Sequence, residues 1–261
     1  MQTMGAAPPT GMFSALAERY RRYRPGYPDS LFEFLATCAG RHGQAWDCGT
    51  GNGQAAMGLV RYFRHVVATD IDARQIAHAF QHPRIDYSVA AAEASGLATA
   101  SVDLITVGEA LHWFQLERFC DEARRVLRPG AMLAIWNYGR CRITPAIDRI
   151  LDEFTDRELG RYWSAAALND NVGHYRVPFN EVEAPQFEIV QQWDLNAFCG
   201  YVSSWSASGA YQREHGHCPV DQLRQKLDGV WDAHGARMPV TWGLNVRVGR
   251  FPSGGAISDS V

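Results

Sequence analysis

The segment best suited to chemistry is a glycine-rich turn with an acidic residue in front of it. Residues 45–53 read AWDCGTGNG and follow a short apolar run. Glycine lets the backbone turn tightly and lets a ligand lie against it without a β-carbon in the way. Asp47 is suited to attract an ammonium group or to order water around one. An ordinary tight turn would use the same glycines. The candidate ligand-binding residues here are Asp47, Cys48, Gly49, Thr50 and Gly51.

The spacing of the glycines separates two kinds of nucleotide site. A dinucleotide site uses G-x-G-x-x-G, with a pyrophosphate at the helix N-terminus, but Gln54 stands at the third position of that pattern. The spacing G-x-G-x-G after an acid favours an S-adenosylmethionine pocket over a nicotinamide one. Asp70 follows at the right distance to accept hydrogen bonds from both ribose hydroxyls. Taken alone, Asp70 could equally cap the next helix, and we expect Asp72 to do so.

Residues after the next strands would complete a nucleoside site. Ile71 would cover one face of an adenine ring. Ala92 and Glu93 lie where a nucleoside site contacts the adenine edge, through backbone amides or the Glu93 side chain. Glu109 would lie near a sulfonium or accept hydrogen bonds from backbone amides after its strand. These four positions are the remaining nucleoside-site candidates in the first half of the chain.

His112 is the candidate catalytic residue. It could take a proton from an alcohol or orient a carboxylate by donating a hydrogen bond. The alternative is a partly buried histidine that packs with Trp113 beneath the cofactor. Trp113 and Phe114 are expected to form pocket wall rather than to react. His215, His217 and Cys218 are too closely spaced, without a second cluster, for a closed zinc site, so we expect no metal.

The elements that position these residues alternate between short apolar runs and helical patterns. This alternation is typical of βαβ units and predicts a doubly wound α/β sheet, in which ligands bind beyond the carboxyl ends of the strands. Strands are expected at 44–48, 65–70, 84–89, 102–108 and 131–138, and helices at 54–63, 73–80 and 116–127. The sequence Arg128-Pro129-Gly130 is expected to stop the last of these helices.

The remainder of the chain is less regular. Helices are expected at 12–22, 29–38, 143–159, 196–208 and 219–233, strands at 187–195 and 240–251, and irregular structure at 161–180. We expect a single domain over residues 12–251. Its parts would be N-terminal lid helices at 12–40, a cofactor-binding half at 44–138, and a second half at 139–251 that caps an acceptor pocket. Residues 1–11 and 252–261 are expected to be flexible ends.

Four further segments carry a resemblance to a known family. They are YRPGYP at 23–28, EALHWF at 109–114, RVLRPG at 125–130 and TWGLNVRVGR at 241–250. With the turn and Asp70, the chain resembles the class I S-adenosylmethionine-dependent methyltransferases, and more narrowly the methyltransferase type 11 family that includes trans-aconitate methyltransferase-like enzymes. The resemblance covers residues 18–138 well and the remainder loosely. Ala91 departs from it, because relatives often carry an acidic or polar residue there.

The resemblance implies a seven-stranded, mostly parallel Rossmann-like sheet with a reversed final strand and helical cap elements. It also implies S-adenosyl-L-methionine as the cofactor and methyl transfer to a small acid or alcohol. Tyr20 and Arg24 would contact the carboxylate end of the cofactor from the lid, or would simply end a surface helix. The expected reaction is O-methylation of a carboxylate or hydroxyl. The alternatives are a methyltransferase acting on RNA or protein, and a nucleoside-binding module without catalysis.

Composition limits the kinds of binding partner that we expect. A formal net charge of −3 gives no general attraction to phosphate backbones, so we expect no nucleic-acid partner. Apolar runs are shorter than the ~18 residues of a membrane span, so no membrane partner is expected. The six cysteines are scattered without a C-x-x-C pair, which favours reduced thiols in a cytoplasm. We therefore expect a cytoplasmic enzyme with a small-molecule acceptor, of undetermined oligomeric state.

Overall fold

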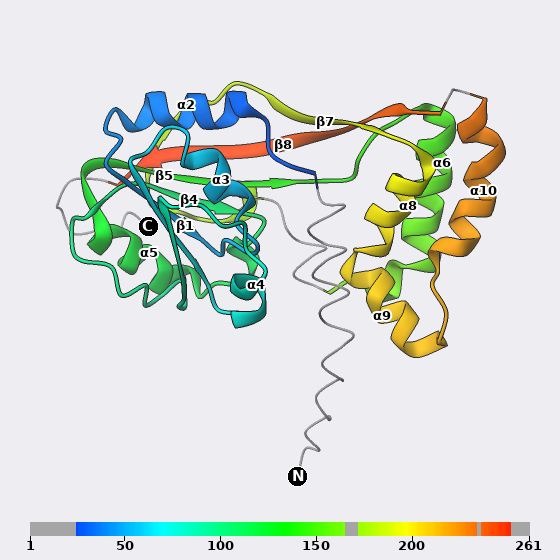
Figure 1. Ribbon diagram of the computed structural model, residues 1–261, viewed down its shortest axis with the longest axis horizontal. Coiled ribbons are helices and arrows are strands. Elements are labelled where there is room, and N and C mark those ends of the chain that lie inside the picture. Colours follow the sequence, from blue (N-terminus) through cyan, green and yellow to red (C-terminus); the bar gives the residue numbers. More distant parts are fainter. Residues whose placement is uncertain (1–24, 165–171, 234–235, 252–261) are drawn as a thin grey trace, which may run out of the picture. The chain divides into compact units, whose positions relative to one another are not determined.

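The computed structural model describes residues 25–164, 172–233 and 236–251 (Figure 1). Contacts divide the chain into two compact units. The sheet unit comprises Gly26–Cys141, Ala165–Val190 and Thr241–Val261, and the helical unit comprises Met1–Pro25, Arg142–Ser164 and Gln191–Val240. The expected helix at 12–22, the two end segments, Tyr20 and Arg24 lie outside the described residues. The single domain expected over 12–251 stays a prediction.

The sheet has eight strands, and seven of them follow the order β3-β2-β1-β4-β5-β8-β6, while β7 pairs with β8. The strands are β1 Gln44–Cys48, β2 His65–Asp70, β3 Ile85–Val89, β4 Val102–Gly108, β5 Leu127–Tyr138, β6 Asn180–Val182, β7 Phe187–Trp193 and β8 Met238–Arg250. The first five strands run parallel, and β8 is antiparallel to β5. The doubly wound α/β fold with a reversed final strand is thus confirmed. The short strand β6 begins at Asn180, the last residue of the segment predicted to be irregular, and was not predicted.

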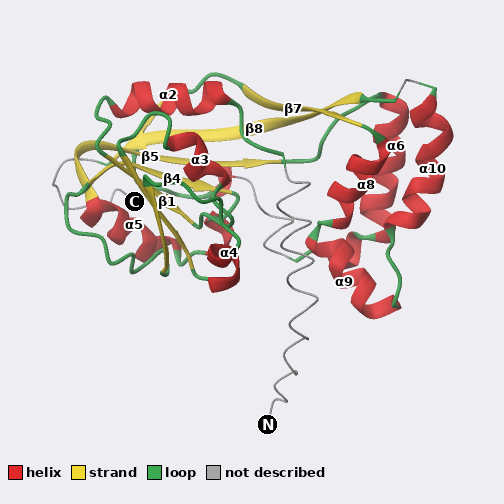
Figure 2. Cartoon of the chain, viewed as in Figure 1, coloured by secondary structure: helices red, strands yellow, loops and turns green. Residues whose placement is uncertain are grey.

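Helices cover both faces of the parallel strands (Figures 1 and 2). In the sheet unit they are α2 Asp29–Ala39, α3 Gln54–Leu59, α4 Ala73–Ala77 and α5 Leu116–Val126. The first six residues of β4 are buried, as expected of a strand covered on both faces. Helix α2 packs on β4 and β5 and α3 on β1 and β2, from the side of the sheet opposite to α5 (Figure 1).

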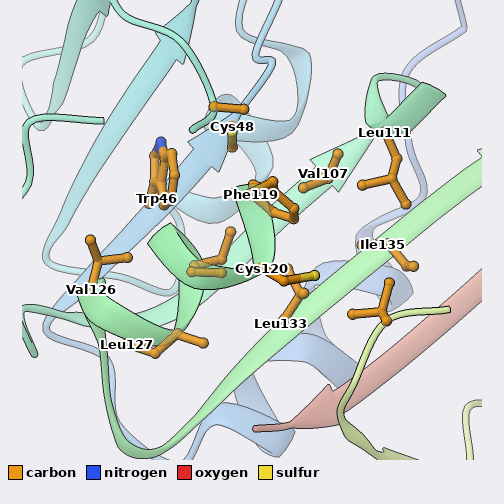
Figure 3. Close-up of a cluster of buried hydrophobic side chains, with 14 of the residues drawn as sticks. Trp46, Cys48, Val107, Leu111, Phe119, Cys120, Val126, Leu127, Leu133 and Ile135 are labelled. Carbon is orange, nitrogen blue, oxygen red and sulfur yellow. The ribbon is translucent and has the colours of Figure 1, made fainter. Parts of the chain in front are cut away.

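The face of the sheet covered by α5 carries a large cluster of buried apolar side chains (Figure 3). Phe119, Cys120, Ala123 and Val126 of α5 are buried there, as the helical periodicity predicts. They meet Trp46 of β1, which is fully buried and whose indole N–H donates to the Thr69 hydroxyl at 2.9 Å. The packing holds α5 against β1, and the hydrogen bond ties β1 to β2.

Helix α5 ends at Val126, and β5 begins at the next residue, earlier than predicted. Leu127 pairs with Val102, and the register then shifts before Met132 pairs with Leu104. Pro129 and Gly130 lie in this irregular stretch, where a missing N–H and a positive φ of 78° at Gly130 are tolerated. The Arg-Pro-Gly sequence therefore ends the helix as predicted but belongs to the strand.

The helical unit contains α6 Pro145–Glu153, α8 Leu195–Ser203, α9 Ser206–His215 and α10 Val220–Asp232. Thr144 caps α6 by accepting from the Ile147 amide at 3.4 Å, and a π-helical turn, Phe154–Glu158, continues it. The helix predicted at 196–208 is wrong, because two helices meet there. The hydroxyls of Ser204 and Ser208 donate to backbone carbonyls of α8, an alternative to continuing the helix.

None of the described helices combines the length and the apolar character that crossing a membrane requires.

Candidate functional site

The glycine turn after β1 is tied to the end of β2. The amides of Gly49 and Thr50 both donate to the Thr69 carbonyl at 2.9 Å. Gly49, Gly51 and Gly53 all have positive φ angles, of 70°, 56° and 90°. These are backbone conformations in which a residue with a β-carbon is strained. The backbone of this turn therefore requires glycine at these three positions.

Two of these glycines face different surroundings. A β-carbon on Gly49 would come within 2.5 Å of the Ala110 β-carbon, so no side chain fits there. A β-carbon on Gly51 would meet nothing within 4 Å. Gly49 is thus required for packing against the loop after β4. Gly51 leaves open space against the backbone, where a ligand can lie.

Asp47 holds the turn from inside. Its side chain is buried, and Oδ2 accepts from the Thr50 hydroxyl at 2.6 Å and from the Ala56 amide at 3.1 Å. Oδ1 accepts from the Thr106 hydroxyl at 2.8 Å. Burial raises the pKa of Asp47 to about 6, and the hydrogen bonds from Thr50 and Thr106 oppose that shift. Attraction of an ammonium group by Asp47 stays a prediction.

Asp70 lies directly against the same turn. Its Oδ2 accepts from the Gly51 amide at 2.8 Å, and its Oδ1 accepts from the Asp72 amide at 2.8 Å. The turn and this acid were predicted to lie together at neighbouring strand ends, and the structure brings them into contact. Asp72 caps α4 by accepting from the Arg74 amide at 2.9 Å, which confirms its predicted role.

Large apolar side chains are exposed at this edge of the sheet. Ile71 is 76% exposed, Val89 55% and Trp113 70%. Ile71 follows β2, Val89 ends β3, and Trp113 comes after β4. Parallel strands present their carboxyl ends at one edge of a sheet. Exposed apolar side chains of this kind are suited to pack against the flat face of a heterocyclic ring. A contact between Ile71 and adenine remains a prediction.

The residues after β3 serve the loop and helix that follow. Ala92 is buried, and Ala91 and Ala94 form a small bridge that closes the loop. The Glu93 carboxylate accepts from the Gln115 amide at 2.7 Å, next to the first turn of α5. Glu93 thereby links the β3 end to the segment after β4. Its predicted contact with the adenine edge is untested.

Glu109 has a left-handed backbone, with φ of 57°, directly after β4. Its amide donates to the Trp136 carbonyl at 2.9 Å, and its carboxylate accepts from the Tyr138 amide at 2.6 Å. This is one of the two readings of Glu109, in which it accepts from backbone amides. Left-handed residues other than glycine gather at functional sites, where surrounding contacts maintain the strain.

His112 lies in a short 3-10 helix, Leu111–Trp113, and is half-buried. Its ring centroid is 4.8 Å from that of Trp113, so the packing contact weighed in the sequence analysis exists. The catalytic role of His112 stays a prediction.

Three side chains of this region were not predicted. Thr106 hydrogen-bonds Asp47, and Tyr87 fills the space beside Gly53, where a β-carbon would lie 2.2 Å from its hydroxyl. Trp136 packs beside Gly108 at the end of β4. A hydroxyl in the mostly apolar strand VDLITVG is the one signal that could have indicated Thr106. Tyr87 and Trp136 are aromatic residues in strands and look like core.

Carboxylates line the carboxyl edge of the parallel strands. They are Asp47, Asp70, Glu93 and Glu109. The charge of Asp70 adds to the effect of burial in raising the pKa of Asp47. An edge with this many acids and an open backbone at Gly51 favours a cationic ligand. This edge of the sheet thus combines an open glycine turn, exposed apolar side chains and several carboxylates.

Comparisons with known proteins place the same segment in one family. The family described as "Methyltransferase domain" matches residues 46–135, from β1 to β5. A methyltransferase of Schizosaccharomyces pombe, named as uncharacterized, is 26% identical over 215 residues, 78% of this chain and 83% of that protein.

Two further relatives cover most of the chain. A protein of Dictyostelium discoideum named as a candidate methyltransferase is 30% identical over 221 residues, which are 82% of this chain and 84% of that protein. A solved structure of a candidate type II methyltransferase from Anaeromyxobacter dehalogenans is 40% identical. Its TM-score is 0.82, and the match covers 88% of this chain and all of that one. The similarity therefore extends over both units.

Proposed function

Because this chain belongs to the class I S-adenosylmethionine-dependent methyltransferases, we propose that it methylates an oxygen, carboxylate or hydroxyl, of a small-molecule acceptor. The observation that carries the placement of the site is the hydrogen bond from the Gly51 amide to Asp70. It joins the turn that a nucleoside would lie against to the carboxylate that would hold its ribose.

The residues present fit S-adenosylmethionine as methyl donor. Asp70 would accept from the ribose hydroxyls, Ile71 would cover the adenine ring, and Gly51 would leave room for the chain of atoms that joins them. Ala92 and Glu93 would lie at the adenine edge. The buried charge of Asp47 would stabilise the cationic end from behind the turn. Cys48, Gly49 and Thr50 would contact the donor along this turn, and Glu109 would lie near the sulfur.

Bound S-adenosylmethionine supplies an electrophilic methyl group on a positively charged sulfur. The protein then needs to align the acceptor oxygen with that methyl group, and alignment can supply much of the rate because effective molarities reach about 10⁵ to 10⁸ M. His112 would orient a carboxylate by donating a hydrogen bond, or remove the proton of a hydroxyl. The acid-lined edge favours the cationic donor and disfavours anionic polymers as acceptors.

The six cysteines are all free, which is the state expected in a reducing compartment. This supports the proposal of a cytoplasmic enzyme. We favour a carboxylate over a hydroxyl because the sequence resembles enzymes that act on small acids.

The deciding experiment is a screen of small carboxylic acids and alcohols for release of S-adenosylhomocysteine by the full chain. Total RNA and a denatured protein extract serve as competing substrates in parallel. Release with a small acid or alcohol supports the proposal. Release with RNA or protein alone would assign a macromolecular acceptor. Binding of S-adenosylhomocysteine without turnover on any class would favour a binding module.

A further inference from the structure

Trp136 lies at the carboxyl end of β5, beside the last residue of β4. Its side chain is 1% exposed, and its ring meets that of Tyr27 edge to face with centroids 5.2 Å apart. A β-carbon on Gly108 would come within 2.8 Å of the indole Nε1 and Cε2 atoms. The nitrogen-bearing edge of the indole therefore lies over Gly108. Glycine at that position leaves room for it.

The indole N–H of Trp136 has no hydrogen-bond acceptor within the described part of the chain, although the nitrogen is buried. An indole nitrogen can only donate, and a buried donor left without an acceptor destabilises a fold measurably. Phenylalanine would fill much of the same space without burying an unpaired N–H. The presence of the Trp136 N–H is explained if a bound ligand supplies its hydrogen-bond acceptor.

The Trp136 side chain lies on the same face of the sheet as the Asp47 carboxylate. Trp136 pairs with Gly108 of β4, and Thr106, two residues earlier on that strand, hydrogen-bonds Asp47. Side chains two residues apart on a strand share a face, and paired residues on neighbouring strands share it too. The donor is thus two strands, or about 10 Å, from the glycine turn. This is within reach of a ligand that lies across β1, β4 and β5.

We propose that the Trp136 N–H donates a hydrogen bond to a carboxylate oxygen of the bound reactants and so positions them for methyl transfer. This inference rests on the proposed function. A carboxylate is the chemistry that most needs such a donor, because the edge is lined by the acids Asp47, Asp70, Glu93 and Glu109, which repel it. A charged acceptor also makes the stronger hydrogen bond. The carboxylate is either that of the methionine part of the cofactor or that of the acceptor.

The direct test is the ¹H–¹⁵N NMR spectrum of the indole groups, with the Trp136 signal identified as the one absent from Trp136→Phe. Three ligand states are compared: S-adenosylhomocysteine, 5′-methylthioadenosine, which lacks the carboxylate, and the S-adenosylhomocysteine complex with added benzoate or octanoate. A downfield shift with S-adenosylhomocysteine but not with 5′-methylthioadenosine assigns the cofactor carboxylate. A shift that requires benzoate or octanoate assigns the acceptor. An unmoved signal in all three states contradicts the proposal.

Affinities give an independent readout with a matched control. Trp231 of α10 is also 1% exposed with a buried N–H that lacks an acceptor among the described residues, but it lies in the helical unit. Trp136→Phe is expected to weaken binding of the carboxylate that moves the signal by about tenfold to a hundredfold. Binding of 5′-methylthioadenosine should stay unchanged, and Trp231→Phe should change neither affinity. Equal weakening of both nucleosides by Trp136→Phe would make the residue structural and overturn the inference.

The two proposals fail in different ways. If the wild-type chain binds neither nucleoside, the proposed function is wrong, and this inference falls with it. If both nucleosides bind while the Trp136 signal does not move with any probe, only the role of Trp136 is wrong.

Discussion

The buried carboxylate of Asp47 makes the stability of this protein depend on pH in an unusual direction. Burial raises its pKa to about 6, so between the ordinary carboxyl range and pH 6 the folded chain keeps a proton that the unfolded chain has released. The contribution of Asp47 to stability therefore falls as pH rises through this window and is constant above it. The ionised form of Asp47 is stabilised by the hydrogen bonds that its carboxylate accepts from Thr50, Thr106 and Ala56.

Asp47→Asn tests this directly. The amide cannot ionise, so the free energy of unfolding of the variant relative to wild type should rise by about 1 to 2 kcal/mol between pH 5 and pH 7.5. Urea denaturation at the two pH values measures the difference. Asp228→Asn, an exposed position on α10, is the control and should show no such trend. A difference that is constant with pH would mean that Asp47 is not held at a raised pKa.

The glycines of the turn should separate folding from binding. Gly49→Ala places a β-carbon 2.5 Å from Ala110 and should lower the free energy of unfolding by about 2 to 4 kcal/mol. Gly51→Ala meets no neighbour and should lose only about 1 to 2 kcal/mol from its positive φ. Calorimetry with S-adenosylhomocysteine should nevertheless show weaker binding by Gly51→Ala. Wild-type affinity in that variant would place the ligand elsewhere.

His112 is the residue on which the proposed chemistry depends most. If it orients or deprotonates the acceptor, His112→Gln should lower kcat about 10²- to 10⁴-fold and leave S-adenosylhomocysteine affinity unchanged. The measurement uses the acceptor found in the substrate screen. Full turnover by the variant would mean that His112 has no role in the reaction and only packs against Trp113.

At the scale of elements, Glu122 joins α5 to the connection between β3 and β4. Its carboxylate accepts from the Arg125 side chain and from the Ser95 amide and hydroxyl. These hydrogen bonds, Arg125 first, lower the pKa of Glu122 to about 2. The stability that this provides is complete above the ordinary carboxyl range and is lost as pH falls toward 2.

Glu122→Gln should therefore lower the free energy of unfolding by about 1 to 3 kcal/mol at pH 7 and by less at pH 3. Chemical denaturation at both pH values reports the change. Asp121→Asn removes the neighbouring exposed pair with Arg124 on the same helix and should change stability by less than about 1 kcal/mol. Equal effects of the two substitutions would mean that the link to Ser95 contributes nothing.

Elements were predictable where hydrophobic runs are short and bounded. The bounds of β1, β2 and β4 agree with the prediction, because each is an apolar run that ends in glycine, aspartate or a turn. Helix α9 was missed beyond residue 208, because the hydroxyls of Ser204 and Ser208 compete for backbone carbonyls and a new helix starts after Trp205. Strand β6 is three residues long and stands on pairing with β8 alone, which no local pattern reveals.

At the scale of the whole molecule, the sequence indicated the class of site better than the side-chain contacts that build it. The approach of Asp70 to the turn followed from strand order, since both stand at carboxyl ends of neighbouring parallel strands. The contacts of Tyr87 and Trp136 depend on side-chain packing between strands and could not be predicted, and the hydroxyl of Thr106 signalled a role without identifying Asp47 as its partner. The division into two compact units likewise arises from contacts between segments far apart in the sequence.

The central claim is that the glycine turn and Asp70 hold one nucleoside. Isothermal titration of S-adenosylhomocysteine into Asp70→Ala measures it, with Asp72→Ala as the control, because the Asp72 side chain caps α4 and pairs with Arg74 in the same loop. We predict at least tenfold weaker binding for Asp70→Ala, as expected when a charged hydrogen-bond acceptor is lost, and wild-type affinity within about twofold for Asp72→Ala, which loses a helix cap and a surface ion pair. Unchanged affinity in folded Asp70→Ala would contradict the account.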